Sequence, residues 1–90
     1  MTIEQMKAYA CECFNIPKDS LNKQCRKAEV VYAKVALSNV LYSKGYTSSE
    51  IGSILGLTHA AILHHLSTLK DRLEYDPEFR RGYEKFNENV

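Results

Sequence analysis

The sequence lacks several features that would assign it to a large class of proteins. It contains no apolar run of about 18 residues, the length that a membrane-spanning helix needs. It also lacks a basic start followed by an apolar segment and a small-residue cleavage site, the pattern of a secretory signal. We therefore expect a cytoplasmic protein that does not contact membranes. A chain of 90 residues suits one small domain with a modest core, so we treat residues 1–90 as a single domain.

Cysteine is scarce and odd in number, with Cys11, Cys13 and Cys25 as the three cysteines. A secreted disulfide framework usually has an even number at higher density. Structural zinc usually takes its ligands from a C-x₂₋₄-C pair joined to a second pair. A zinc site built from Cys11-Glu-Cys13, Cys25 and a histidine stays open as an alternative. The favoured interpretation is free thiols on a helix, so we expect no metal and no cofactor.

Two further absences concern chemistry. The chain has no G-x-x-x-x-G-K-[ST] motif, so it cannot cradle and hydrolyse ATP in a P-loop. No set of nucleophile, base and orienting group is recognisable either. We therefore expect a protein that is not an enzyme, with no catalytic residues and no small-molecule substrate.

The charge that is present is unevenly distributed, although the net charge is only +1. Between residues 18 and 44 the cations are Lys18, Lys23, Arg26, Lys27, Lys34 and Lys44, against Asp19 and Glu29. From residue 71 onward carboxylates outnumber cations. A nearly neutral protein with one basic segment can still present a basic face to nucleic acid.

Helical periodicity and capping signals predict an all-α fold without strands. Capping boxes start at Thr2 and Thr47, and Asp76-Pro77 reads as an N-cap followed by proline at the first helical position. Gly45 is the expected left-handed residue after the longest helix, which is apolar almost all round and therefore central. The expected helices are 3–14, 27–43, 47–55, 58–74 and a last one from 77.

Residues 47–74 have the sequence form of a helix-turn-helix. Gly52 supplies a small residue where the two helices cross, and Gly56 tolerates the positive φ that the turn needs. The apolar anchors that fix the angle between the helices would be Ile51, Leu55, Leu57, Ile62 and Leu66. This pattern predicts binding of double-stranded DNA.

The second helix, about 58–74, would be the recognition helix in the major groove. Its apolar stripe is Ile62, Leu66, Leu69 and Leu73, with Thr58 as N-cap. The residues expected nearest the bases are Thr58, His59, Ala60, Ala61 and His64. Ser48, Ser49 and Thr68 complete the predicted contacts from these two helices. Alanine methyls can meet a thymine methyl, and histidine can donate or accept a hydrogen bond.

The three histidines do not require a metal. His59 and His64 are five residues apart, whereas a spacing of four places two imidazoles on one helix face, and no Glu follows His59 as in H-E-x-x-H. His65 lies near the predicted core edge and is expected to pack rather than to bind.

Nearly the whole chain resembles the C-terminal DNA-binding domain of the bacterial chromosomal replication initiator DnaA, in the Trp-repressor-like group. The resemblance lies in the loop Asn22–Lys27, in Ser49-Glu50-Ile51-Gly52 and above all in Leu55-Gly56-Leu57-Thr58-His59-Ala60-Ala61-Ile62-Leu63-His64. The family's typical form of the last stretch is L-G-R-D-H-S/T-T-V-L-H. This resemblance implies a small helical domain of the same type, acting in replication initiation or transcription regulation and associated with the nucleoid.

The resemblance also implies roles for single residues. Arg26 is the candidate for a basic-loop arginine in the minor groove, with Lys23 and Lys27 beside it. An arginine that the family commonly has in the long helix falls on Ala33 or Lys34, and we expect Lys34 to face phosphate. The sequence departs from the family's pattern at two places. Thr58 replaces the acidic residue before the histidine, and Ala60-Ala61 replaces the pair of hydroxyl residues after it.

A helical protein-interaction module is the alternative to DNA binding. Six tyrosines are available for an interface (Tyr9, Tyr32, Tyr42, Tyr46, Tyr75 and Tyr83), and tyrosine suits interfaces as well as cores. In this interpretation the two alanines mark the loss of base reading, and a protein partner has been gained.

Overall fold

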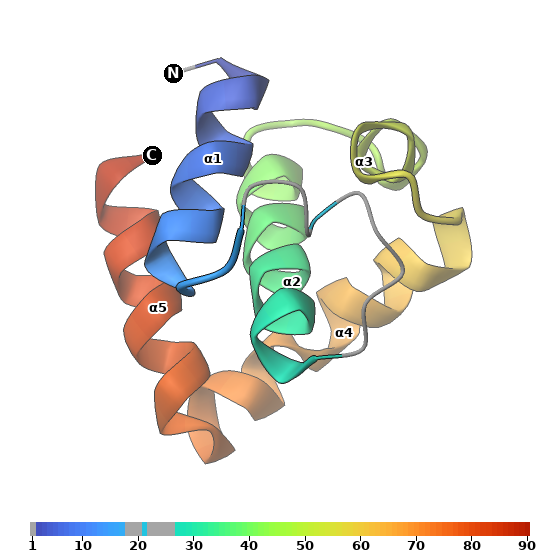
Figure 1. Ribbon diagram of the computed structural model, residues 1–90. Helices are drawn as coiled ribbons and strands as arrows, with labels where there is room; N and C mark the ends of the chain where they lie inside the picture. The colour runs from blue at the N-terminus through green and yellow to red at the C-terminus, as the bar shows by residue number, and fades with distance from the viewer. Residues whose placement is uncertain (1, 18–20, 22–26) are drawn as a thin grey trace.

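The computed structural model describes residues 2–17, 21 and 27–90. Within these ranges the chain forms five helices and no strand (Figure 1). The helices are α1 (Ile3–Cys13), α2 (Ala28–Ser43), α3 (Ser48–Leu55), α4 (His59–Tyr75) and α5 (Pro77–Asn89). The prediction of an all-α fold is therefore confirmed. The sites predicted at Lys23 and Arg26, and the thiol of Cys25, lie outside the described residues.

The expected capping residues start the helices. The hydroxyls of Thr2 and Thr47 each accept a hydrogen bond from the backbone N–H three residues further along the chain. In turn, the side chains of Gln5 and Glu50 accept from the backbone N–H of Thr2 and Thr47. Asp76 caps α5 in the same way, accepting from the N–H of Phe79 at 3.3 Å. Because these side chains satisfy backbone groups that a helix leaves unpaired, the helix starts can be placed from sequence alone.

The end of α2 is a Schellman motif around Gly45, whose φ is +102°. The N–H of Tyr46 donates to the carbonyl of Leu41 at 3.2 Å, and the N–H of Gly45 donates to Tyr42 at 3.1 Å. A left-handed residue is required at this position, and glycine adopts that conformation without steric cost. The predicted stop after α2 is confirmed, but α2, with 16 residues, is not the longest helix, because α4 has 17.

Helix α2 is the centre of the fold. It contacts α1, α3, α4 and α5, and Figure 1 shows it between α1 and α5 on one side and α3 and α4 on the other. Nine of its 16 residues are buried. This explains the apolar character on nearly every face of α2, as the sequence predicts.

Aromatic rings of α2, of α5 and of Phe14, the residue directly after α1, pack together where these three helices meet. The ring of Phe79 lies 6.0 Å from that of Phe14, 5.5 Å from that of Tyr32 and 5.6 Å from that of Tyr83. The hydroxyl of Tyr32 donates to Asp76, and this bond raises the pKa of Tyr32 to about 12. The cluster therefore ties α2 to the start of α5. In the part of the chain that the structure describes, no helix is long and apolar enough to cross a bilayer.

Candidate nucleic-acid interface

The turn between α3 and α4 depends on two glycines. Gly56 has φ +68°, a left-handed conformation, and its N–H donates to the carbonyl of Gly52. The N–H of Leu57 donates to the same carbonyl at 2.8 Å. A Cβ atom built on Gly52 would lie 2.7 Å from the carbonyl oxygen of Leu57. The small residue at position 52 is thus needed because the backbone of the turn passes directly over it.

The predicted apolar anchors lie where they can fix α3 against α4. Ile51 and Leu55 of α3 are buried, and so is Ile62 of α4. Leu57 in the turn and Leu66 in α4 are partly buried against the same core. The two helices are in direct contact, and both contact α2. Their relative orientation is therefore set by packing as well as by the turn.

Thr58 starts α4 as the predicted N-cap. Its hydroxyl accepts from the N–H of Ala61 at 3.1 Å. This bond occupies the hydroxyl with the backbone of its own helix.

One face of α4 is directed to solvent. His59, Ala60 and His64 are exposed, as the sequence predicts, and Ala61 and Thr68 lie half-buried at its margin. Leu63 is 48% exposed on the same face and is not among the predicted contacts. Its position beside His59 on a helical wheel is the signal that could have identified it. The exposed tip of α4 is thus largely apolar, with imidazole rings between methyl groups.

The His59 ring contacts α3, an arrangement that the sequence does not predict. Its Nδ1 lies 2.8 Å from the Oγ of Ser48 and 3.5 Å from the Oγ of Ser49. Ser48 and Ser49 are the first two residues of α3, whereas His59 is the first residue of α4. Three of the predicted contact residues are therefore brought together at one corner of the molecule.

One carboxylate lies at this corner, that of Glu50 in the first turn of α3, which accepts a hydrogen bond from the backbone N–H of Thr47. From Ile51 to Lys70 the sequence has no aspartate or glutamate. The N-termini of α3 and α4 both lie in the corner, and a helix N-terminus carries partial positive charge from its unpaired N–H groups. These features favour an anionic ligand such as a phosphate backbone.

The basic residues predicted to touch phosphate are not equivalent. Lys27 is exposed and occupies the N-cap position of α2. Lys34 is only 7% exposed, because it lies on α2, which four other helices surround. The expectation that Lys34 faces phosphate is therefore corrected: a side chain buried in this way is not part of a surface.

His65 has a packing role, as predicted. Its ring is partly buried, and burial together with the positive charges of His64, Arg72 and Lys34 lowers its pKa to about 4. Its carbonyl accepts from the side-chain amide of Asn39 at 3.3 Å, which links α4 to α2. His65 is thus a neutral residue at the core edge.

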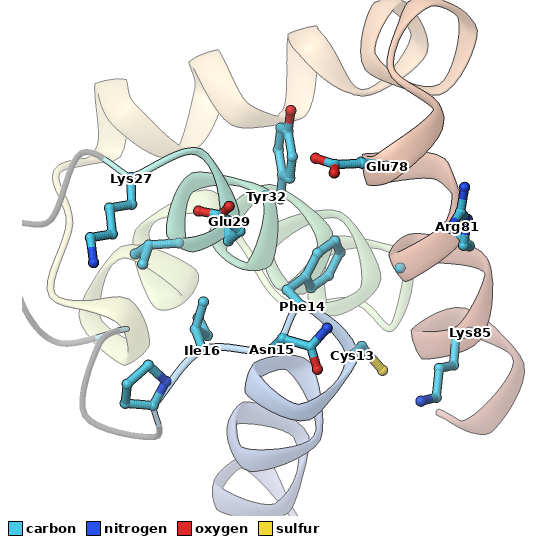
Figure 2. A pocket seen from close by; sticks show the side chains of 13 residues that line it. Cys13, Phe14, Asn15, Ile16, Lys27, Glu29, Tyr32, Glu78, Arg81 and Lys85 are labelled. Atoms are coloured by element: carbon cyan, nitrogen blue, oxygen red, sulfur yellow. The ribbon is translucent and has the colours of Figure 1, made fainter.

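A pocket of about 860 Å³ opens at a different place, between the end of α1, the start of α2 and α5 (Figure 2). Its described lining includes the charged residues Lys27, Glu29, Glu78, Arg81 and Lys85, and none of α3 or α4. Burial raises the pKa of the Cys13 thiol at its edge, which works against nucleophilic reactivity. Among the described residues no group of three His, Cys, Asp or Glu side chains could hold a metal ion.

Comparison with known proteins identifies what the chain is similar to. It is 30% identical over 82 residues to the "Chromosomal replication initiator protein DnaA" of Bacteroides thetaiotaomicron, covering 89% of this chain and 17% of that protein. It is 31% identical over 86 residues to the protein of the same name from Bacteroides fragilis, covering 93% of this chain and 18% of that protein. No family model matches the chain. No solved structure matches it significantly.

The resemblance to DnaA that the motifs indicate is confirmed by these two proteins. The chain spans less than a fifth of the length of either one, 17% and 18%. A match of this extent is consistent with a fragment that resembles the C-terminal domain of DnaA.

Proposed function

We propose that the chain binds double-stranded DNA through a helix-turn-helix formed by α3 and α4, with α4 in the major groove. The observation that carries this proposal is the exposed face of α4 beside the start of α3, in a chain similar to a chromosomal replication initiator and without aspartate or glutamate from Ile51 to Lys70. A short helix, a tight turn and a longer amphipathic helix are the parts that this docking mode needs.

The exposed tip of α4 supplies the proposed base contacts. His59, Ala60 and His64 face solvent there, with Ala61 beside them. Thr58 also lies at the tip, although its hydroxyl is occupied as N-cap. Two alanines and an exposed Leu63 offer methyl groups, which suit the methyl group of thymine.

The proposed backbone contacts are basic residues outside this tip. Lys27 is exposed at the start of α2, and Lys23 and Arg26 precede it in the sequence. The resemblance to DnaA places an arginine of this loop in the minor groove, and Arg26 is the candidate here. Ser48, Ser49 and Thr68 flank the recognition face and complete the interface.

The activity proposed is binding rather than catalysis, within replication or transcription regulation and in contact with the nucleoid. The curated relatives are initiators, and this chain matches only 17–18% of them. A role in replication follows from their name, and a role in transcription from the docking mode. The proposed cellular site is the cytoplasm, where chromosomal DNA lies in bacteria.

A protein-interaction module is the second candidate function. Tyr42 is 56% exposed and Tyr75 is 76% exposed, in addition to the exposed Leu63. Exposed tyrosines are typical of protein interfaces. Such a module would need no affinity for DNA.

A salt titration separates these two functions. If Lys23, Arg26 and Lys27 contact phosphate, the logarithm of the binding constant falls with the logarithm of salt by about 0.9 per neutralised phosphate. The measurement is fluorescence anisotropy with a labelled random duplex. Failure to bind any duplex at low salt would favour the interaction module.

Base reading is tested with a selection from random duplexes and with two variants. Each good base contact contributes about 1–3 kcal/mol of discrimination, and the alanines replace two hydrogen-bonding residues of the family pattern. We expect at most about a tenfold preference for the initiator's own box over a scrambled duplex. His59→Ala should remove most of the preference, whereas Arg26→Ala should weaken binding to every sequence. Lys85→Ala, on α5 beside the distant pocket, is the matched control.

A further inference from the structure

We propose that Ser48 is a positioning residue that orients His59 and determines which kind of base edge the histidine reads. This inference rests on the proposed DNA binding. It adds a specific claim, namely that His59 presents an N–H donor at Nε2 because Ser48 engages Nδ1.

The contact joins two fixed points of the backbone. Ser48 is the first residue of α3, directly after the capping box of Thr47 and Glu50. His59 is the first residue of α4, directly after the N-cap Thr58. The Gly52 carbonyl accepts two N–H bonds from the turn, so the starts of α3 and α4 keep a fixed separation. The Ser48 Oγ to His59 Nδ1 distance of 2.8 Å therefore belongs to a preorganised pair.

The surroundings decide which partner donates. Nδ1 lies beside the first residues of α3, whose N–H groups contribute partial positive charge, while the Glu50 carboxylate of the same turn is engaged by the N–H of Thr47. A lone pair is favoured in that field, whereas a proton on Nδ1 is disfavoured. Ser48 can rotate its hydroxyl to donate, and Ser49 at 3.5 Å is a second, longer contact. In a neutral imidazole the proton then lies on Nε2.

This tautomer predicts a base preference. With Nδ1 engaged, Nε2 is the ring nitrogen left for the ligand, and it acts as a donor. Guanine offers N7 and O6 as acceptors in the major groove, adenine offers N7 and thymine offers O4. Cytosine presents an amino donor there, which cannot accept from Nε2–H. We therefore infer that one position of any bound sequence disfavours cytosine, and that Ser48 is required for this discrimination.

The tautomer is tested first on the free protein. Long-range ¹H–¹⁵N spectra of the imidazoles, recorded at pH of about 8 where an ordinary histidine is neutral, distinguish a protonated from an unprotonated nitrogen. The signals are assigned with His59→Gln. We expect Nε2 to carry the proton in the wild type, a mixture of tautomers in Ser48→Ala, and recovery in Ser48→Thr, which restores a hydroxyl. Ser49→Ala is the matched control and should change the spectrum less.

The reading of the base is tested with the same variants and duplexes randomised at one position at a time. We expect Ser48→Ala to reduce the discrimination against cytosine by about three- to tenfold, and Ser48→Thr to recover it. Circular dichroism confirms that each variant is folded.

The outcomes separate this inference from the proposed function. A proton on Nδ1 in the wild type overturns the inference, and so does a Ser48→Ala variant with the wild-type tautomer or the wild-type base preference. In each of these cases DNA binding itself stands. A protein that binds no duplex at all overturns the proposed function and this inference with it, even if the spectra show the expected tautomer.

Discussion

Helices α2 and α4 are of nearly equal length but have opposite environments. Nine of the 16 residues of α2 are buried, whereas Ile62 is the buried residue among the 17 of α4. Helix α2 is surrounded by four helices, and α4 covers one side of it. The difference shows a division between the two helices: α2 supplies the buried apolar surface that stabilises the fold, and α4 keeps an exposed face, which is the face proposed to bind DNA.

The separation has a physical basis. A residue that contacts an external ligand must remain exposed before binding, so it contributes little apolar burial to folding. In the proposed DNA-binding mode this role falls to the exposed side of α4, which includes His59 and His64. The helix is held by Ile62, by partly buried leucines and by its caps. Substitutions at these supports should destabilise the protein, and substitutions on the free face should not.

The largest expected effect is at the buried residue of α4. Ile62→Ala removes a fully buried side chain and should lower the free energy of unfolding by about 2–5 kcal/mol. Its neighbour Leu63 is 48% exposed, and Leu63→Ala should change the free energy by no more than about 0.5 kcal/mol. Urea unfolding followed by circular dichroism compares the two. Equal losses would mean that α4 packs with a different face.

The next effect concerns the turn that orients α4. Gly52→Ala places a Cβ atom 2.7 Å from the carbonyl oxygen of Leu57, a backbone atom that cannot rotate away. We expect a loss of about 1–3 kcal/mol, as for other overpacked sites. Ser53→Ala, at the adjacent exposed position, is the control and should be nearly neutral. Thermal unfolding of both variants measures the difference, and a stable Gly52→Ala protein would contradict this account of the turn.

A smaller effect, dependent on pH, is expected where α4 meets α2. The pKa of His65 is lowered from 6.5 to about 4 in the folded protein, chiefly by burial. Above pH 6.5 the ring is neutral in both states. As the pH falls from 6.5 toward 4 the unfolded chain takes up a proton that the folded protein does not, so stability decreases.

Unfolding free energies across this pH range test the linkage. We expect His65→Gln to flatten the profile by about 1–2 kcal/mol, with allowance for the partial exposure of the ring. His64→Gln, at the exposed neighbouring position, should alter the slope less. An unchanged profile in His65→Gln would assign the dependence to other groups.

The smallest effect is at the cap of α4. Thr58→Ala removes the acceptor for the Ala61 N–H and should cost about 1 kcal/mol. Thr58→Ser keeps the hydroxyl and should retain most of the stability. Chemical unfolding measures both. Because the cap supports a helix with little burial, a cost near zero would show that tertiary contacts alone hold its first turn.

Much of this protein could be predicted from sequence because the signals are local. A capping box at Thr47 and a left-handed glycine at Gly45 act on backbone groups within a few residues. The periodic leucines of α4 and the all-round apolar pattern of α2 likewise report which faces are covered. These features place the helices, the turn and the exposed face that contains His59, and they carry the resemblance to DnaA that the curated relatives confirm.

Three features were decided by the tertiary structure alone. Lys34 is buried because four helices surround α2, although a lysine on a helix predicts exposure. The lowered pKa of His65 arises first from burial and then from charges on α2 and α4, and both exist only in the folded chain. The contact between Ser48 and His59 spans eleven residues, and it exists because the turn at Gly56 brings the two helix starts together. Sequence determines local backbone preferences and the covered faces, whereas the partners of a polar side chain depend on distances that only packing sets.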